Sequence, residues 1–115
     1  MILIITLNPL LERRFSFEQA LLGSVNRNAV TKISAGGKGI NVSRQLKKLG
    51  VKSYNYFFSR ETNGKMYRDA LKSEGVDFSS IATKSETRHS AIVISEKDKI
   101  VSSFFSEDPK ILQNE

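Results

Sequence analysis

The hydrophobic pattern of the chain begins with a nearly unbroken apolar run. The first seven residues, MILIITL, end at the turn signal Asn8-Pro9. A short apolar run rich in β-branched residues is typical of a strand buried on both faces. Further strands are predicted at Val51 to Phe58 and between Val76 and Ile81.

Two amphipathic helices are predicted between these strands. The first extends from about Gly39 to Leu49, and the second begins near the predicted N-cap Asn63. Both end in a Gly-Val pair, where glycine suits the left-handed backbone of a helix C-terminus. The predicted apolar faces are Val42, Leu46 and Leu49 on the first helix and Met66, Tyr67, Ala70 and Leu71 on the second. This alternation of strands and helices predicts an α/β fold with a parallel sheet and crossover helices.

Shorter segments alternate apolar and polar residues and predict a second group of strands. They are Arg13 to Phe17 and Asn28 to Ser34, followed by a β-hairpin of Ala91 to Ser95 and Ile100 to Phe105 around the polar turn EKDK. Asp108-Pro109 is a helix-start signal with too few residues after it to form a helix. A parallel sheet of so few strands would also have an open edge and an uncovered face. We therefore expect the chain to be shorter than its fold.

Composition narrows the class of protein only slightly. The chain has 115 residues, enough for one domain at most, and 39% of them are hydrophobic. Its 18 Lys and Arg against 12 Asp and Glu give a net charge of +6, which fits an anionic partner or a merely basic surface. The absence of cysteine excludes disulfides and cysteine-based metal sites and fits a cytoplasmic protein. The apolar run at the N-terminus is too short to span a membrane, so no membrane partner is expected.

The stretch SAGGKGINVSRQL, residues 34–46, is the main candidate for ligand binding. It does not match the P-loop, because Gly39 follows Gly37-Lys38, and Val42 replaces the third glycine of a dinucleotide fingerprint. Glycines nevertheless allow close backbone approach, and a helix that begins near Gly39 directs free N–H groups toward a ligand. With Lys38 and Asn41 alongside, this suits a polyhydroxylated anion. The alternative is a tight turn without a ligand.

Several other polar residues are predicted to be structural. His89 is expected to be an exposed or hydrogen-bonded residue at a strand start. Two groups are interpreted as solvated helix faces: Arg44, Lys47 and Lys48 on the first helix, and Asp69 and Glu74 on the second. The basic group lacks interleaved aromatic residues, so nucleic acid is not an expected partner.

Four motifs together resemble the N-terminal part of the PfkB-type sugar kinases, within the ribokinase-like fold. They are TLNPLLE (residues 6–12), VNR (25–27), GGKGINVSRQLKKLG (36–50) and ETR (86–88). In motif style they are similar to 1-phosphofructokinase and tagatose-6-phosphate kinase. The resemblance covers nearly the whole chain. It implies that residues 1–115 are the N-terminal part of a single kinase domain, with an α/β/α core and a small β lid formed by strands at about 13–34 and 89–105.

The resemblance also implies a hexose phosphate as ligand and assigns roles to six positions. Gly36, Gly37, Lys38 and Asn41 would contact sugar hydroxyls and phosphate, and Arg88 would pair with the phosphate. Glu12 replaces a family Asp that chelates sugar hydroxyls. The Glu12 carboxylate lies one methylene further from the backbone than that of Asp. Because catalytic sites tolerate a displacement of only about 0.5 Å, we expect this contact with the sugar to change. Ser59 and Arg60 stand where the family has a Gly-Gly pair.

The donor side of the kinase reaction is not represented in these residues. The family's catalytic Asp lies in a Gly-Ala-Gly-Asp motif of the C-terminal half, with the ATP site, and that motif does not occur here. Mg-ATP is thus implied for a full-length member, with its site outside this chain. Phosphoryl transfer requires both donor and acceptor sides, so we expect this chain alone to be non-catalytic. The alternative is a remnant that binds a sugar phosphate or pairs with another chain, as a homo-oligomer or heteromer, through the lid or an open sheet edge.

Overall fold

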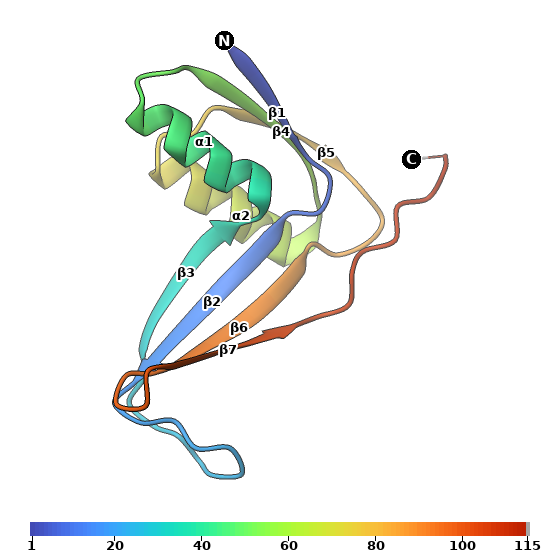
Figure 1. Ribbon diagram of the computed structural model, residues 1–115. Coiled ribbons are helices and arrows are strands. Elements are labelled where there is room, and N and C mark those ends of the chain that lie inside the picture. The colour runs from blue at the N-terminus through green and yellow to red at the C-terminus, as the bar shows by residue number, and fades with distance from the viewer. Residues whose placement is uncertain (115) are drawn as a thin grey trace.

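Two separate sheets and two helices make up residues 1–114, the part of the chain that the computed structural model describes (Figure 1). The core sheet is parallel, with strand order β1-β4-β5, and the lid sheet has the order β3-β2-β6-β7. The core strands are β1 (Ile2–Thr6), β4 (Ser53–Ser59) and β5 (Phe78–Ala82). The lid strands are β2 (Leu10–Phe17), β3 (Val30–Gly36), β6 (Arg88–Ser95) and β7 (Ile100–Phe105). The helices are α1 (Lys38–Lys48) and α2 (Glu61–Ser73).

The predicted parallel sheet with crossover helices is confirmed. Helix α1 connects the lid to β4, α2 connects β4 to β5, and both helices lie on the same side of the core sheet (Figure 1). Helix α1 packs closely on β1 because Gly39 has no side chain: a Cβ atom there would meet the Thr6 hydroxyl. In the described residues no helix is long and apolar enough to cross a membrane.

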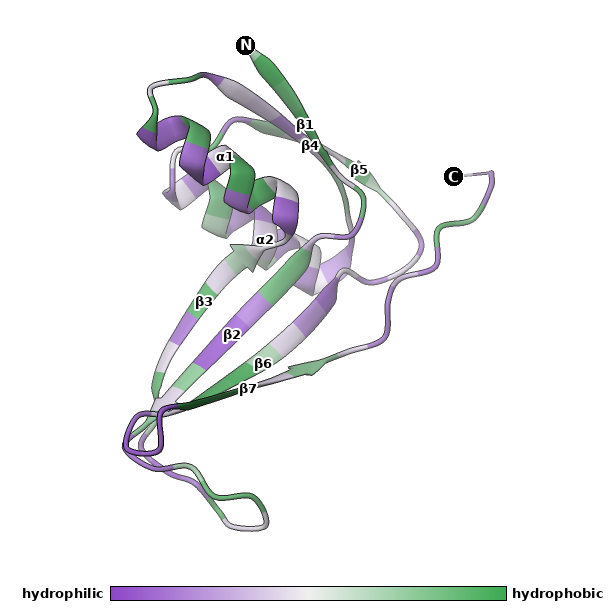
Figure 2. Ribbon diagram, in the orientation of Figure 1, coloured by the Kyte–Doolittle hydropathy of each residue, from purple (hydrophilic) through white to green (hydrophobic). Residues whose placement is uncertain are grey.

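The prediction that the first strand is buried on both faces is wrong. Ile4 and Thr6 are buried beneath α1, but the side chains of Leu3 and Ile5 on the opposite face are 62% and 59% exposed. The reason is that β1 is an edge strand, and the helices of this chain cover only one face of its sheet (Figures 1 and 2). The expected open edge and uncovered face are therefore present in the described structure.

The lid sheet combines both strand directions. Strand β2 pairs antiparallel with β3 and parallel with β6, so segments far apart in sequence lie side by side, and β6 and β7 form the predicted hairpin. Strand β2 begins at Leu10, three residues earlier than predicted, and β3 continues to Gly36. Strand β3 begins at Val30 rather than Asn28, so it is displaced by two residues and has the predicted length. Both strands extend further toward the core than predicted because the lid ladder continues up to the junction, where Leu10 pairs with Gly36.

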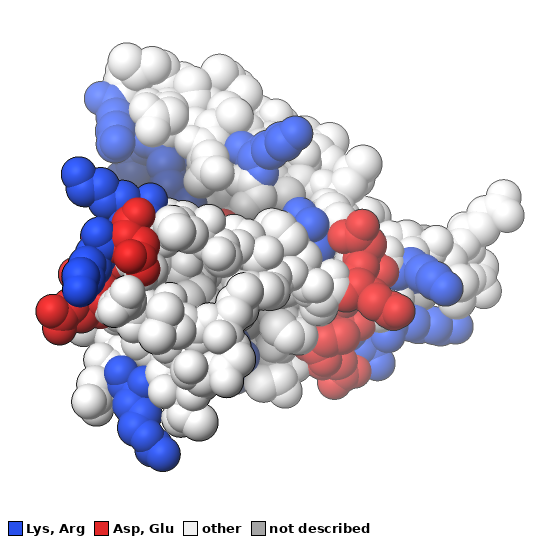
Figure 3. Space-filling model, turned by 60° about the horizontal axis from the view of Figure 1, so that its bottom comes forward, with Lys and Arg blue, Asp and Glu red and all other residues white. Residues whose placement is uncertain are grey.

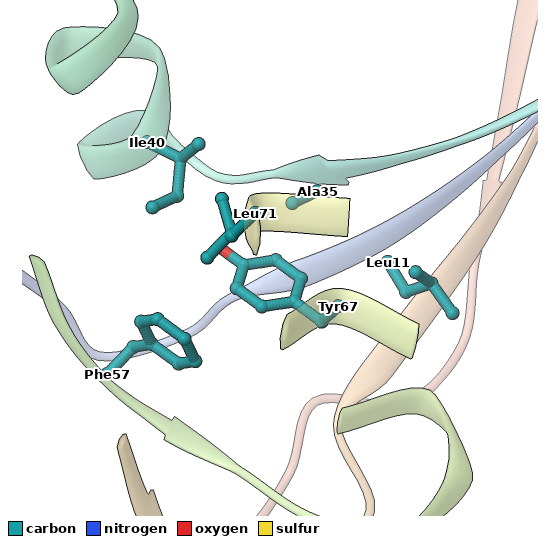
Figure 4. Packing of buried hydrophobic residues seen from close by; sticks show 6 residues of the cluster. All are labelled: Leu11, Ala35, Ile40, Phe57, Tyr67 and Leu71. Carbon is teal, nitrogen blue, oxygen red and sulfur yellow. The ribbon is translucent and has the colours of Figure 1, made fainter. Parts of the chain in front are cut away.

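A buried cluster joins the lid to the core sheet (Figure 4). Its members are Leu11 and Ala35 from the lid, Ile40 from α1, Phe57 from β4, and Tyr67 and Leu71 from α2. The ring of Tyr67 meets that of Phe57 edge-on, with centroids 5.0 Å apart. The predicted apolar face of α2 is therefore confirmed. Because one cluster spans both sheets, the angle between lid and core is set by side-chain packing.

The predicted apolar face of α1 is wrong at Val42 and Leu49, although Leu46 is partly buried as expected. Val42 and Leu49 are exposed, whereas Ile40 and Ser43 are the buried residues of this helix. Ser43 faces the sheet because its hydroxyl hydrogen-bonds with that of Ser53, at 2.9 Å, and accepts a bond from the Asn55 amide. A polar contact, which apolar spacing does not reveal, thus determines the rotation of the helix.

Helix α2 begins two residues earlier than the predicted cap, Asn63, because residues from elsewhere satisfy its first N–H groups. The Arg60 N–H donates to the Thr87 hydroxyl at 3.0 Å, and the Asn63 N–H donates to the Glu86 carboxylate at 2.9 Å. Arg60 is half-exposed and pairs with Glu61, whose φ of 56° lies in the left-handed region. Asp108-Pro109 does not begin a helix in the described residues.

Candidate functional site

The candidate site lies where β3 ends, α1 begins and the lid meets the core. In the lid ladder, Leu10 of β2 lies between Gly36 of β3 and Arg88 of β6. Two residues further along β2, Glu12 lies between Ser34 and Ser90. Side chains alternate along a strand, so these two rows share one face of the lid, opposite to buried Leu11. With strands about 4.8 Å apart, the Gly36 and Arg88 backbones lie about 10 Å from each other.

The glycine turn, formed by Gly36 and Gly37, places the start of α1 in this junction. The first N–H groups of the helix are not capped by a side chain. Gly37 is the N-cap residue, with φ of 114°, a conformation that favours glycine, and no side chain caps the helix. The free N–H groups and the helix dipole make this end of α1 attractive to an anion. Lys38 is exposed and makes no hydrogen bond or ion pair with the described residues, so its ammonium group is free to meet a ligand.

The Glu12 carboxylate lies directly against the glycine turn. A Cβ atom on Gly36 would come within 2.6 Å of Glu12 Oε1. The same carboxylate accepts a hydrogen bond from the Ser34 hydroxyl at 3.4 Å and lies 3.8 Å from the Arg14 guanidinium. The longer side chain of Glu12 is thus accommodated because Gly36 has no side chain. Its acceptor oxygens are positioned beside the start of α1.

Arg44 holds this junction together, which corrects its interpretation as part of a solvated helix face. Its guanidinium donates to both carboxylate oxygens of Glu74, at 2.8 and 2.7 Å, to the Ala35 carbonyl at 2.6 Å, and to Asn41 Oδ1 at 2.9 Å. Hydrogen bonding to Arg44 lowers the pKa of Glu74, and the same bonds raise the pKa of Arg44. The network joins α1, the end of β3 and the segment after α2. It also fixes the amide of Asn41 through its oxygen, so its NH₂ group remains as a donor.

Tyr67 makes a second stabilising contact with the glycine turn. Its buried hydroxyl donates to the Gly36 carbonyl at 2.8 Å, and burial raises the pKa of this phenol. The glycine turn is thus supported by a hydrogen bond from α2 and by Arg44, rather than by its own sequence alone.

Arg88 lies on the β6 side of the junction. Its guanidinium donates to the Asn8 and Pro9 carbonyls, at 3.1 and 3.4 Å, and to Asp108 Oδ1 at 3.4 Å. The group also stacks over Phe105, with 5.9 Å from Cζ to the ring centroid. The arginine is therefore held at the rim of the junction, with the Asp108 carboxylate beside its guanidinium.

Sequence reasoning missed two residues of this site. The hydroxyl of Ser90, whose residue is only 1% exposed, has no hydrogen-bond partner in the described structure, and neither has the buried Thr6 hydroxyl against Gly39. Ser90 is adjacent to Glu12 across β2 and β6. His89, in contrast, is exposed as expected, and its ring lies 3.1 Å from the Asn63 amide.

No group of three or more His, Asp or Glu side chains in residues 1–114 is arranged to hold a metal ion. On the face of the molecule in Figure 3, lysines and arginines lie beside acidic residues and do not form a continuous basic surface.

The parallel sheet, the small β lid and the glycine-rich helix start between them place the chain in the class of proteins with the ribokinase-like fold. The sequence model of the pfkB family carbohydrate kinases matches residues 3–110, and the chain belongs to this family. Among curated relatives, it is 31% identical over 96 residues to the tagatose-6-phosphate kinase of Staphylococcus epidermidis, which aligns 84% of this chain and 31% of that protein. It is 34% identical over 88 residues to the 1-phosphofructokinase of Bacillus subtilis, covering 76% of this chain and 29% of that protein.

Solved structures show the same fold over almost the whole chain. Phosphofructokinase-2 of Escherichia coli, in complex with fructose-6-phosphate, superposes with a TM-score of 0.89 at 24% identity, over 98% of this chain and 37% of that one. A protein from Thermotoga maritima described as a possible 1-phosphofructokinase superposes with a TM-score of 0.85 at 33% identity, over 96% of this chain and 36% of that one. The chain thus spans about a third of the length of these relatives.

Proposed function

We propose that this chain is the acceptor-binding, N-terminal part of an ATP-dependent hexose-phosphate kinase. The substrate would be fructose 1-phosphate, tagatose 6-phosphate or a close analogue. The observation that carries this proposal is the convergence of Glu12, the uncapped start of α1 and Arg88 on one junction between lid and core. The names of the curated relatives, tagatose-6-phosphate kinase and 1-phosphofructokinase, support the choice of substrate class.

The chemistry of the junction suits a phosphorylated sugar. Free N–H groups of α1 and the Lys38 ammonium attract the phosphate or neutralise negative charge near it. Glu12 and the unpartnered Ser90 hydroxyl provide acceptors for sugar hydroxyls, and Asn41 provides a donor. The residues of this chain bind and orient the acceptor sugar. We propose that Mg-ATP and the catalytic base belong to the remaining part of the kinase domain.

Binding of the sugar phosphate is tested by isothermal titration calorimetry on the 115-residue chain. Fructose 1-phosphate and tagatose 6-phosphate are titrated, with fructose and inorganic phosphate as ligand controls. We expect Asn41→Ala to weaken binding at least tenfold, because the substitution removes the amide donor. Lys65→Ala, which removes an exposed lysine on α2, is expected to leave the affinity unchanged. Equal affinity for inorganic phosphate alone, or no binding of either sugar phosphate, would contradict the proposal.

The role of Arg88 is tested through its neighbour Asp108. The Asp108 carboxylate accepts from both Arg88 and the Asn8 amide, and so competes with a phosphate for the guanidinium. We expect Asp108→Ala to raise the affinity for the sugar phosphate several-fold, and Asp108→Ala/Arg88→Ala to lose that gain. Glu107→Ala removes the same charge from the adjacent residue and is the matched control. A similar gain in the control would show that only net charge matters.

A second candidate function, pairing of subunits through the lid, is favoured by an apolar hollow on the lid. It is lined by residues of β2, β6 and β7 and of the loop after β2, including Phe15, Phe17, Leu21, Val93 and Phe104. One structural neighbour is a tetrameric form of phosphofructokinase-2, with a TM-score of 0.83 at 24% identity. We expect Leu22→Glu in this exposed loop to shift a dimer toward monomer in analytical ultracentrifugation, whereas Ser24→Glu does not. A monomeric parent chain would contradict pairing.

A further inference from the structure

A polar hollow beside β3 contains two cations that the site described above does not use. It lies between the lid, α1 and the end of α2, has a volume of about 500 Å³, and is lined mostly by charged and polar side chains. Glu12 and Asn41 line it together with Arg14 and Lys32. Arg88 lines a different hollow, so the cations of the polar hollow are separate from the arginine of the junction.

Arg14 and Lys32 are direct cross-strand neighbours on one face of the lid. The antiparallel register of β2 and β3 pairs them, and it pairs Glu12 with Ser34 two positions closer to the core. Like charges that lie directly opposite each other on a sheet destabilise it. An anion bound between the two side chains would replace this repulsion with two charge-assisted contacts. The pair is therefore unfavourable in the empty sheet and favourable in a complex with an anion.

Neither cation has a full counterion among the described residues. Lys32 is exposed and makes no hydrogen bond or ion pair with residues 1–114. The guanidinium of Arg14 comes no closer than 3.8 Å to the Glu12 carboxylate, and its side chain is 48% exposed. The other acid of the hollow, Glu74, already accepts hydrogen bonds from Arg44 with both oxygens. Three cations and two acids line the hollow, so its net charge is +1, and Arg14 and Lys32 are the cations available to a ligand.

We propose that Arg14 and Lys32 form an oxyanion subsite, which receives a phosphate group in addition to the one bound at the junction. Arginine offers paired N–H donors that match phosphate oxygens, and lysine adds a mobile charge. A step of two residues along a strand is about 7 Å, so a sugar held by Glu12 can present a second phosphate to this pair.

The ligand of the subsite is a phosphate-type oxyanion, which can come from two sources. One is the second phosphate of a hexose bisphosphate, and this form of the inference rests on the function proposed above. The other is free inorganic phosphate, and this form does not depend on that function. The hollow is large enough for either group, with a volume of about 500 Å³.

The test compares fructose 1,6-bisphosphate, fructose 1-phosphate and inorganic phosphate on the 115-residue chain. Calorimetry measures the affinities, and amide shifts of the ¹⁵N-labelled chain locate each ligand. If a sugar supplies the second phosphate, we expect the bisphosphate to bind at least tenfold more tightly than the monophosphate. If free phosphate is the source, we expect inorganic phosphate to bind alone, with shifts at Arg14 and Lys32. Equal affinities for the two sugars, together with no phosphate-induced shifts at Arg14 and Lys32, would overturn the proposal.

Failure of the proposed function gives a different result. In that case fructose 1-phosphate does not bind, whereas inorganic phosphate or the bisphosphate still shifts the amides of Arg14 and Lys32. Failure of the subsite alone leaves fructose 1-phosphate bound at the junction, with no gain from a second phosphate.

Matched variants separate the subsite from net charge. Lys32→Thr is expected to remove the tenfold preference for the bisphosphate, or to weaken inorganic phosphate at least tenfold, and to change the affinity for fructose 1-phosphate less than twofold. Lys97→Thr removes the same charge from the exposed turn between β6 and β7 and is expected to leave all three affinities unchanged. Circular dichroism confirms that each variant is folded. An equal loss in both variants, or a preference that Lys32→Thr leaves intact, would overturn the proposal.

Discussion

The two faces of the core sheet differ in whether helices of this chain cover them. On the helix-covered face, Phe57 packs against Tyr67 and Leu71, and the same cluster reaches Leu11 and Ala35 in the lid. On the helix-free face, Ile5 and its neighbours meet no layer of the described structure. The helix-covered face therefore both stabilises the chain and positions the glycine turn, whereas the helix-free face does neither in the described structure.

The largest effect is expected at Tyr67, at the centre of the covered face. Tyr67→Ala removes the aromatic contact with Phe57 and leaves a cavity, so we expect a loss of about 3–5 kcal/mol in the free energy of unfolding. Tyr67→Phe keeps the ring and leaves the Gly36 carbonyl without its donor, for a loss of about 1 kcal/mol. Urea denaturation measures both. Equal losses in the two variants would mean that the ring does not hold the two sheets together.

An intermediate effect is expected at Glu61, where α2 begins. A non-glycine residue with φ of 56° carries backbone strain, which glycine relieves. We expect Glu61→Gly to be more stable than Glu61→Ala by about 1 kcal/mol, measured by thermal unfolding. Both variants lose the ion pair with Arg60, so the comparison isolates the backbone. A more stable alanine variant would argue against left-handed backbone at this position.

The contribution of the Arg44–Glu74 pair is expected to depend on pH. Hydrogen bonding to Arg44 holds the folded-state pKa of Glu74 below its ordinary value, so the pair stabilises the fold fully above that ordinary value. This stability is lost as pH falls through the folded-state pKa. We expect Glu74→Gln to cost about 1 kcal/mol or less at pH 7, because the pair is partly exposed, and to cost nothing at pH 2.

Urea denaturation of Glu74→Gln and the parent chain at both pH values measures this difference. Asp69→Gln removes an acid whose partner, Lys65, is exposed on α2, and serves as the control. A cost for Glu74→Gln that is the same at both pH values would show that the carboxylate charge is not responsible.

The smallest effect on stability is expected on the helix-free face. Ile5→Lys changes an exposed side chain, so we expect the free energy of unfolding to change by less than about 0.5 kcal/mol. The same variant should clearly reduce the fluorescence of a dye that binds apolar surfaces, whereas Val30→Lys should reduce it less. A loss of several kcal/mol would mean that this face is packed in solution, and it would remove the distinction between the two faces.

The period of the hydrophobic pattern predicted the kind and order of most elements, because strands and helices repeat at different spacings. It did not predict which side of a strand is covered. The run that includes Leu3 and Ile5 was expected to be buried, and only the arrangement of α1 and α2 shows that it is not. The rotation of α1 was also missed, since the polar contact between Ser43 and Asn55 determines it.

The candidate site was predicted in part. The glycines, Lys38 and Asn41 were found from the glycine-rich helix start itself, and Glu12 and Arg88 through the motif resemblance. The structure gathers them around one junction. Their role in binding remains a proposal. The supporting role of Arg44 was missed, because its partner Glu74 is 30 positions away and becomes a neighbour only when α1 and α2 pack. Ser90 was missed because a single serine in a strand carries no local signal of a site.

The central claim, that the lid–core junction holds a sugar phosphate, is tested most directly by NMR. Amide chemical shifts of the ¹⁵N-labelled chain are followed while fructose 1-phosphate is added. We expect saturable shifts concentrated in Gly36 to Asn41, with further shifts at Glu12 and Arg88. No shifts, or shifts centred on Lys47 and Lys48 at the opposite end of α1, would contradict it.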